Sequence, residues 1–178
     1  MLYPVTFRPI LKSVIWGGAD ICPFKGIEPL QDGIGESWEL SHVEGNVSVV
    51  AEGSLAGKSL EELINTYGDK LLGKKVMDSF GTTFPLLIKF IDARDHLSIQ
   101  VHPDDELAAK RHNSFGKTEM WYIMDADPKA RLYLGFNQDM SPESFYSRCE
   151  NETLPDVMNC IVPKKGECYF IPAGLIHA

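Results

Sequence analysis

The sequence contains few cysteines, and their spacing is not typical of a disulfide framework or a cysteine-based zinc site. Four occur among 178 residues, at Cys22, Cys149, Cys160 and Cys168, and no two form a C-x-x-C pair. Free thiols in a reducing compartment are the simplest interpretation, which predicts a cytoplasmic protein. Cys160 and Cys168 fall in apolar runs typical of strands, so we expect both side chains to be buried.

The sequence also lacks a long hydrophobic run, an excess of positive charge and a nucleotide-binding motif. No stretch reaches the roughly 18 apolar residues of a membrane helix, so we predict no membrane association. The net charge of −8 argues against nucleic acid as a partner. Neither a G-x-G-x-x-G nor a P-loop pattern occurs. The 44% hydrophobic and 24% charged residues are typical of a globular protein with a real core.

Many short segments with alternating or apolar side chains, separated by turns, predict a protein built mostly from strands. We predict strands over residues 5–11, 36–41, 46–51, 84–91, 97–101, 119–124, 130–134, 157–162 and 167–171. Helices are predicted over 59–72, where Ser59 and Glu62 form a capping box, over 104–112, and from Pro142. This pattern favours one mostly β domain over residues 1–178, a sandwich or jelly-roll barrel with a few peripheral helices.

The segment 97–105, Leu-Ser-Ile-Gln-Val-His-Pro-Asp-Asp, carries the first candidate site. Side chains alternate along a strand, so Gln100 and His102 share one face while the aliphatic residues line the other. Two ligand-type side chains on one rigid face are a plausible half of a metal site. A polar edge strand with a surface histidine is the alternative.

Three later positions extend this candidate site. Lys117 and Glu119 share one face of the strand predicted at 119–124, and His177 lies near the end of the chain. Two histidines, a glutamate and an amide oxygen suit a divalent ion, because zinc binds imidazole and carboxylate and leaves a position for water or substrate. Iron or manganese would fit the same side chains, so the residues alone leave the metal open.

At these residues the sequence resembles the type I mannose-6-phosphate isomerases, which are cupin metalloenzymes, and above all their short bacterial class. The matching blocks are Trp16-Gly17-Gly18 and the segments 35–39, 85–93, 97–105, 116–122 and 171–178. They occur in the family's order and cover essentially the whole chain, which makes the joint match far more specific than any single block.

The resemblance implies roles for individual residues. Four residues fall on the family's zinc-ligand positions: Gln100, His102, Glu119 and His177. The assignment of Gln100 is less firm than that of the other three. We expect one zinc ion per chain. Lys117 falls on a lysine for which we expect a catalytic role. Lys89 and Ser98 fall on residues that line the substrate pocket.

Two departures from the family pattern matter. Longer members carry a histidine immediately before the second lysine, where this sequence has Gly116. The family pattern also continues past the block that ends at Ala178, and its catalytic arginine lies in that continuation. The resemblance therefore predicts either a fragment of a longer protein or a truncated gene product, and the residues present do not identify the general base.

The activity implied is the interconversion of mannose 6-phosphate and fructose 6-phosphate through a cis-enediol, a step of carbohydrate metabolism. The expected partners are a phosphorylated hexose and a second copy of the chain in a homodimer, because an interrupted barrel leaves open sheet edges. One alternative is a non-catalytic sugar-phosphate-binding cupin that keeps the metal site without the arginine. Another is an iron-dependent cupin oxygenase built on two histidines and a carboxylate.

Overall fold

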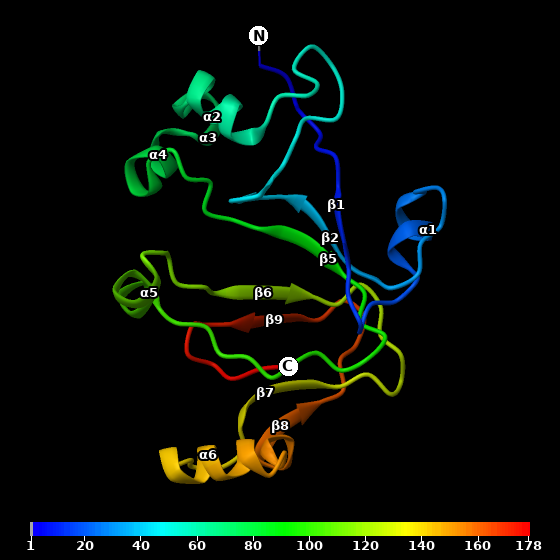
Figure 1. Ribbon diagram of the computed structural model, residues 1–178, viewed down its shortest axis with the longest axis vertical. Helices are drawn as coiled ribbons and strands as arrows, with labels where there is room; N and C mark the ends of the chain where they lie inside the picture. Colours follow the sequence, from blue (N-terminus) through cyan, green and yellow to red (C-terminus); the bar gives the residue numbers. More distant parts are fainter. Residues whose placement is uncertain (1) are drawn as a thin grey trace. The chain divides into compact units, whose positions relative to one another are not determined.

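The computed structural model describes residues 2–178, which divide into two compact units, Met1–His96 and Leu97–Ala178. Both units consist of short antiparallel strands with helices between them (Figure 1). No helix within residues 2–178 is long and apolar enough to cross a membrane. The single domain predicted from the sequence thus contains two compact parts, and each is described separately below.

The first unit is organised around a three-stranded antiparallel sheet in the order β1-β2-β5, formed by β1 (Ile10–Ser13), β2 (Ile34–Leu40) and β5 (Ile88–Ile91). Trp38 of β2 is registered between Ile10 of β1 and Lys89 of β5. Residues 84–87, predicted as part of β5, lie outside the strand. The sheet therefore places Lys89 beside the central tryptophan.

The two faces of β2 carry different polar networks, because its side chains alternate. On one face the Glu36 carboxylate accepts from Lys89 Nζ at 2.7 Å and from the Trp38 indole N–H at 2.6 Å. On the other face Glu39 accepts from Lys25 Nζ at 2.6 Å, where α1 (Ile21–Lys25) approaches the sheet. Two lysine–glutamate pairs are thus distributed over opposite faces of one strand.

The glycines of the Trp16-Gly17-Gly18 motif have a packing role. A Cβ on Gly17 would lie 2.4 Å from the Gly33 carbonyl oxygen, and one on Gly18 would lie 2.3 Å from the Asp92 carboxylate. The Asp20 N–H donates to Asp92 Oδ2 at 2.7 Å. These contacts order the long irregular segment that precedes β2, so its glycines serve close backbone approach.

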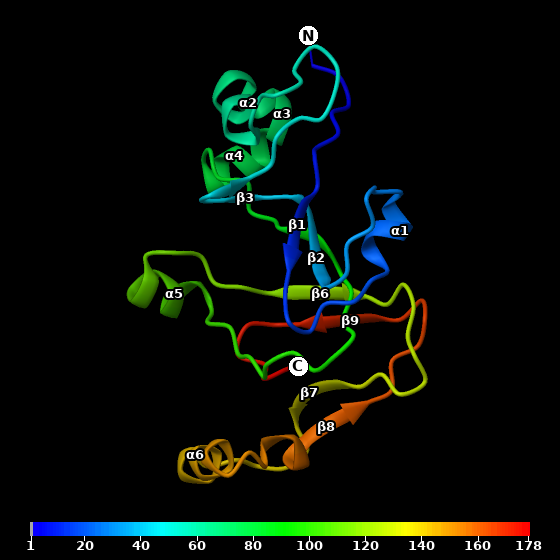
Figure 2. The same ribbon diagram turned by 45° about the vertical axis from the view of Figure 1, so that its right-hand side comes forward.

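A hairpin and three helices complete the first unit (Figure 2). The hairpin pairs β3 (His42–Val43) with β4 (Asn46–Val47). The single helix predicted over 59–72 is broken at Gly68 into α2 (Leu60–Tyr67) and α3 (Asp69–Leu72), and α4 (Lys74–Phe80) follows unpredicted. The Ser59–Glu62 capping box is confirmed at the start of α2. Gly68 has φ +51° and ψ −121°, a non-helical conformation open to glycine.

The second unit contains two separate strand pairs. β6 (Glu119–Tyr122) pairs with β9 (Cys168–Ile171), and β7 (Leu132–Phe136) pairs with β8 (Met158–Ile161), both antiparallel. The helices are α5 (Asp105–His112), capped by Asp104, and α6 (Pro142–Glu150), capped by Ser141, with a 3₁₀ turn at Leu154–Val157. Proline at the first position of α6 is confirmed.

The last three residues of the chain lie between two other segments of the second unit. His177 exchanges two main-chain hydrogen bonds with Gln100, of 2.8 and 2.9 Å, and Ala178 exchanges two with Tyr133. The segment predicted as a strand over 97–101 is extended, but its strand pairing is confined to this bridge at Gln100. Long-range pairing thus brings residues 100, 133 and 177 together.

The burial expected for Cys160 and Cys168 is wrong, because both are exposed. Cys168 shares one side of β9 with Phe170, which is 69% exposed, whereas Ile171 on the other side is buried. The strands before and after Lys164-Lys165-Gly166 pair with other strands, β8 with β7 and β9 with β6. Short sheets with no closed barrel are found within residues 2–178, so the jelly-roll barrel stays a prediction.

Candidate metal centre

Three side chains from distant parts of the second unit converge on one point. One ligand-type atom from each of His102, Glu119 and His177 lies within 4.8 Å of the other two. Glu119 Oε2 is 3.5 Å from His102 Nε2 and 3.2 Å from His177 Nε2. The side chains of His102, Glu119 and His177 are 17%, 15% and 4% exposed. The three side chains are therefore largely shielded from solvent.

His102 is held by the backbone of the segment that carries it. Its carbonyl accepts from the Gly174 N–H at 2.8 Å, which ties this segment to the turn before His177. Pro103 follows, and Asp104 then begins α5 by accepting from the Leu107 N–H at 2.8 Å. The extended segment is thereby anchored on both sides of the imidazole.

Glu119 is brought beside His102 by a close contact between their two segments. The Lys117 N–H donates to the Pro103 carbonyl at 3.0 Å. Gly116 packs so tightly that a Cβ there would lie 2.4 Å from the Asp104 carbonyl carbon. A glycine therefore permits the approach, which gives a structural reason for the departure from the family pattern at this position.

His177 is held through both its main chain and its ring. Its main chain is bonded to Gln100, as described above. Its ring Nδ1 lies 2.9 Å from the Leu175 carbonyl oxygen. A carbonyl oxygen can only accept, so Nδ1 carries the proton in this contact, and Nε2 is the nitrogen beside Glu119. This arrangement is the usual one for a metal-binding histidine, whose second nitrogen donates to a fixed acceptor.

The charges around Glu119 favour its ionised form. Burial raises the pKa of Glu119, but the hydrogen bond from Lys117, the charge of Lys117 and the electrostatic effect of the two neighbouring imidazoles outweigh burial and leave this pKa below its ordinary value. Lys117 Nζ lies 2.9 Å from Oε1, whereas both imidazoles approach Oε2. The carboxylate therefore stays charged and presents one oxygen to the histidines.

These donors fit a divalent transition metal. Two imidazole nitrogens and one carboxylate oxygen form a three-ligand set that zinc uses in catalytic sites, with the remaining position left for water or substrate. The same set suits iron and manganese. The structure thus brings residues 102, 119 and 177 together in a group that could hold one ion, without identifying the metal. Their role as ligands stays a prediction.

Gln100 and Ser98 are placed differently from the three converging side chains. Both are exposed, and the Gln100 amide donates to Ser98 Oγ at 3.2 Å. The main chain of Gln100 supports His177, so this residue contributes to the site through its backbone. A ligand role for the Gln100 side chain and a substrate role for Ser98 stay predictions.

Lys89 belongs to the first unit, where its ammonium is paired with Glu36 as described above. Its side chain is 21% exposed and that of Glu36 is 15% exposed. Lys12 lies on the same face, with Nζ 4.7 Å from the centre of the Trp38 ring and bonded to Asn46. The Lys89 ammonium is thus fixed on one face of the sheet by its ion pair with Glu36. Its contact with substrate stays a prediction.

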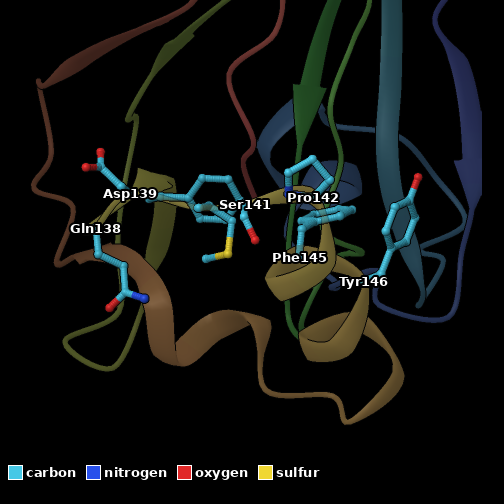
Figure 3. Close-up of a pocket in the computed structure, with 8 residues that line it drawn as sticks. Gln138, Asp139, Ser141, Pro142, Phe145 and Tyr146 are labelled. Atoms are coloured by element: carbon cyan, nitrogen blue, oxygen red, sulfur yellow. The ribbon is translucent and has the colours of Figure 1, made fainter.

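Two hollows occur on the second unit away from the three converging side chains. One of about 520 Å³ lies at the start of α6, lined by Phe136, Phe145, Tyr146 and neighbouring residues (Figure 3). The other, of about 410 Å³, is lined by Gln100, Arg148, Glu152 and mostly apolar residues. Neither hollow is lined by His102, Glu119 or His177.

One neighbour of the site was not predicted from the sequence. The Trp121 ring meets the His177 ring edge to face, with centroids 5.6 Å apart and planes at 80°. Trp121 follows Glu119 by two residues, so the strand period places both on one face. This spacing of two residues could have pointed to Trp121 as a neighbour of the site. An aromatic side chain in a strand, however, more often belongs to the hydrophobic core.

Comparison with known proteins shows which family the chain is similar to. The family described as phosphomannose isomerase type I, catalytic domain, matches residues 6–138. Mannose-6-phosphate isomerase ManA of Bacillus subtilis is 35% identical over 176 residues, which cover 98% of this chain and 54% of ManA. The mannose-6-phosphate isomerase of Streptococcus mutans is 33% identical over 178 residues, covering 100% of this chain and 54% of that protein.

A solved structure gives the same result in three dimensions. The crystal structure of a mannose 6-phosphate isomerase from Bacillus subtilis aligns with a TM-score of 0.84 and 32% identity, over 98% of this chain and 54% of that one. The chain therefore spans about half the length of the relatives it matches. On the match of family, sequence and structure together, the chain belongs to the type I phosphomannose isomerases, in their short bacterial form.

Proposed function

We propose that this chain carries the metal centre of a zinc-dependent isomerase that interconverts mannose 6-phosphate and fructose 6-phosphate. The observation that supports the proposal most directly is the convergence of His102, Glu119 and His177 on one point. The relatives named above are mannose-6-phosphate isomerases, and they match the chain over its whole length. The substrate is inferred from those relatives, the presence of a divalent metal from the donor set, and zinc from the family resemblance.

In this proposal His102, Glu119 and His177 hold one zinc ion per chain, with the Gln100 amide as an additional ligand. A divalent ion at this point would stabilise negative charge on the sugar oxygens as a proton moves between C1 and C2. The hydrogen bond from Nδ1 to Leu175 keeps His177 in the tautomer that presents Nε2. The lowered pKa of Glu119 keeps its carboxylate ionised at neutral pH.

The remaining candidate residues, Lys117, Lys89 and Ser98, would contact the anionic substrate. The Lys117 side chain is 45% exposed, so its ammonium can reach a sugar bound beside Glu119. A fixed cation there would stabilise the enediolate that forms as the proton leaves carbon. Lys89 would contact the phosphate, because its pairing with Glu36 fixes its position, and Ser98 would line the sugar site. The general base is left unassigned.

The proposal carries finer expectations about the protein as a whole. We expect the two units to belong to one cupin-type jelly-roll domain. We expect a cytoplasmic location, with a phosphorylated hexose as ligand and a homodimer as the assembly. These expectations rest on the family resemblance and on the free thiols.

The test combines metal analysis with an isomerase assay. The purified chain is loaded with zinc, its metal content is measured, and fructose 6-phosphate formation from mannose 6-phosphate is followed with and without a chelator. Glu119→Gln is the diagnostic variant, because it keeps the shape of the side chain and removes its charge. His112→Ala, at the exposed end of α5, is the matched histidine control.

The outcomes separate the candidate functions. One bound zinc and chelator-sensitive turnover, both lost in Glu119→Gln and kept in His112→Ala, support the proposal. Zinc and sugar-phosphate binding without turnover would replace it with a non-catalytic sugar-phosphate-binding role. If the wild-type chain binds no divalent metal, the assignment of the centre is wrong.

A further inference from the structure

We infer that Trp121 is a positioning residue for His177, and that its indole ring sets the affinity of the centre for its metal. The inference rests on the proposed function, because it assumes that His102, Glu119 and His177 bind a metal. It assigns a role to a side chain that supplies no ligand atom. It is confined to the second unit, where all of these residues lie.

The first step is the placement of Trp121 on the strand that supplies Glu119. β6 pairs with β9 so that Glu119 is opposite Ile171 and Trp121 is opposite Tyr169. Side chains two apart on a strand share a face, so Glu119 and Trp121 project to the same side of this pair. The neighbour across from Glu119, Ile171, is 1% exposed. This face of β6 is therefore packed, and the indole has little freedom to move away.

The second step is the contact itself. The 80° angle and 5.6 Å separation between the rings of Trp121 and His177 describe an edge-to-face contact, which aromatic pairs prefer over flat stacking. The His102 ring is also near His177, with centroids 5.0 Å apart at 55°. The imidazole of His177 is thus bordered by two rings, of which only His102 is itself a ligand.

The third step concerns the freedom that the other contacts leave to His177. Its main chain is fixed by Gln100, and Nδ1 is bonded to the Leu175 carbonyl. One hydrogen bond still allows the ring to swing, because the terminal torsion of histidine has a broad energy minimum. The indole limits that swing and keeps Nε2 directed toward Glu119 Oε2, 3.2 Å away.

The fourth step is the polarity of the surroundings. An apolar wall beside a metal ligand excludes water and strengthens the attraction between the ion and its donors. Trp121 supplies such a wall next to the most buried of the three ligands. Replacement of groups that hydrogen-bond to a metal ligand weakens metal affinity by about 10–100-fold, and for a ring contact we expect an effect at the lower end of that range. We therefore expect a measurable loss of zinc affinity when the indole is removed.

The experiment measures zinc affinity in variants of the complete chain by competition with a chromophoric chelator. Trp121→Leu removes the ring and keeps an apolar side chain, and Trp121→Phe retains an aromatic ring. Tyr122→Leu is the matched control, since Tyr122 follows Trp121 on β6, projects from the opposite face and is 59% exposed. The absorption spectrum of bound Co²⁺ reports the geometry of the ligands independently of any activity.

We expect Trp121→Leu to bind zinc about tenfold more weakly, with an altered Co²⁺ spectrum, and Trp121→Phe to recover most of the affinity. Tyr122→Leu should cause neither change. Unchanged affinity and spectrum in Trp121→Leu would overturn the inference. A wild-type chain that binds no zinc would instead overturn the proposed function itself.

A measurement on the wild-type chain covers the case in which Trp121→Leu fails to fold. In the zinc-loaded protein, nuclear Overhauser effects should connect the indole protons of Trp121 with the imidazole protons of His177. Their presence supports the inference. Their absence shows that the two rings separate when metal binds, and the role assigned to Trp121 is then wrong.

Discussion

Lys117 and Glu119 are joined through one carboxylate oxygen only. Lys117 Nζ lies 2.9 Å from Oε1, and the two imidazoles lie 3.2 and 3.5 Å from Oε2. The carboxylate can therefore bind a metal through one oxygen and keep its lysine on the other. One oxygen of Glu119 thus faces the two histidines and the other faces Lys117, so Lys117 can be replaced without removing a ligand atom.

Replacement of Lys117 by Met should leave the metal in place and remove activity. The three ligand atoms are untouched, so metal content should stay at the wild-type level. The isomerase rate should fall at least about 100-fold, as expected when a group that stabilises developing negative charge is lost. Lys110→Met, on the exposed side of α5, is the control. Loss of metal in Lys117→Met would mean instead that the lysine serves to position Glu119.

Zinc should stabilise the second unit, because its three ligands come from segments that are distant in the sequence. A ligand that binds only the folded state at 100 times its Kd adds about 2.7 kcal/mol of stability. Thermal unfolding with zinc and with chelator should differ accordingly. The difference should vanish in Glu119→Gln. An equal shift in that variant would place the metal elsewhere.

Lys89 and Lys25 allow a matched test of phosphate recognition. Both pair with a glutamate of β2, at 2.7 and 2.6 Å, on opposite faces of the strand. We expect Lys89→Met to raise KM for mannose 6-phosphate at least about tenfold, since a charge-assisted hydrogen bond contributes about 1.5–3 kcal/mol. Lys25→Met should leave KM unchanged. Equal effects in the two variants would assign Lys89 a purely structural role.

Gly116→Ala should destabilise the second unit, although an alanine usually stabilises a position whose backbone it can adopt. The added Cβ would lie 2.4 Å from the Asp104 carbonyl carbon, and backbone cannot move aside as a flexible side chain can. Overpacking of this kind costs about 1–3 kcal/mol. Chemical denaturation measures the loss, with the exposed neighbour substitution Thr118→Ala as control. A neutral Gly116→Ala would show that the two ligand segments are not in close contact.

The capping box of α2 should make stability depend on pH through Glu62. The hydrogen bond from the Ser59 backbone, together with Lys58, lowers the pKa of Glu62 in the folded chain. A lowered folded pKa means that the stabilisation is present above the ordinary value and is lost as pH falls through the folded value. Between pH 6 and pH 3 the wild type should therefore lose more stability than Glu62→Gln. Glu61→Gln, an exposed neighbour in the first turn, should behave like the wild type.

Features that depend on neighbouring residues were predicted well from the sequence. The capping box at Ser59 and the start of α6 at Pro142 are confirmed, because each is decided within one helical turn. Strand positions were right within a few residues for most elements. Strand partners were not predicted, since the pairing of β9 with β6 joins residues about 50 positions apart, which no local pattern encodes.

By itself the sequence determined which side chains could bind a metal and which faces they share within each segment. The alternation of side chains put Glu119 on one face with Lys117, and the histidines were evident as candidate ligands. Only the tertiary structure decided that residues 102, 119 and 177 meet, that one oxygen of Glu119 faces both histidines, and that Trp121 borders His177. The physical reason is that side-chain direction follows from local backbone geometry, whereas these contacts depend on main-chain pairing between distant segments.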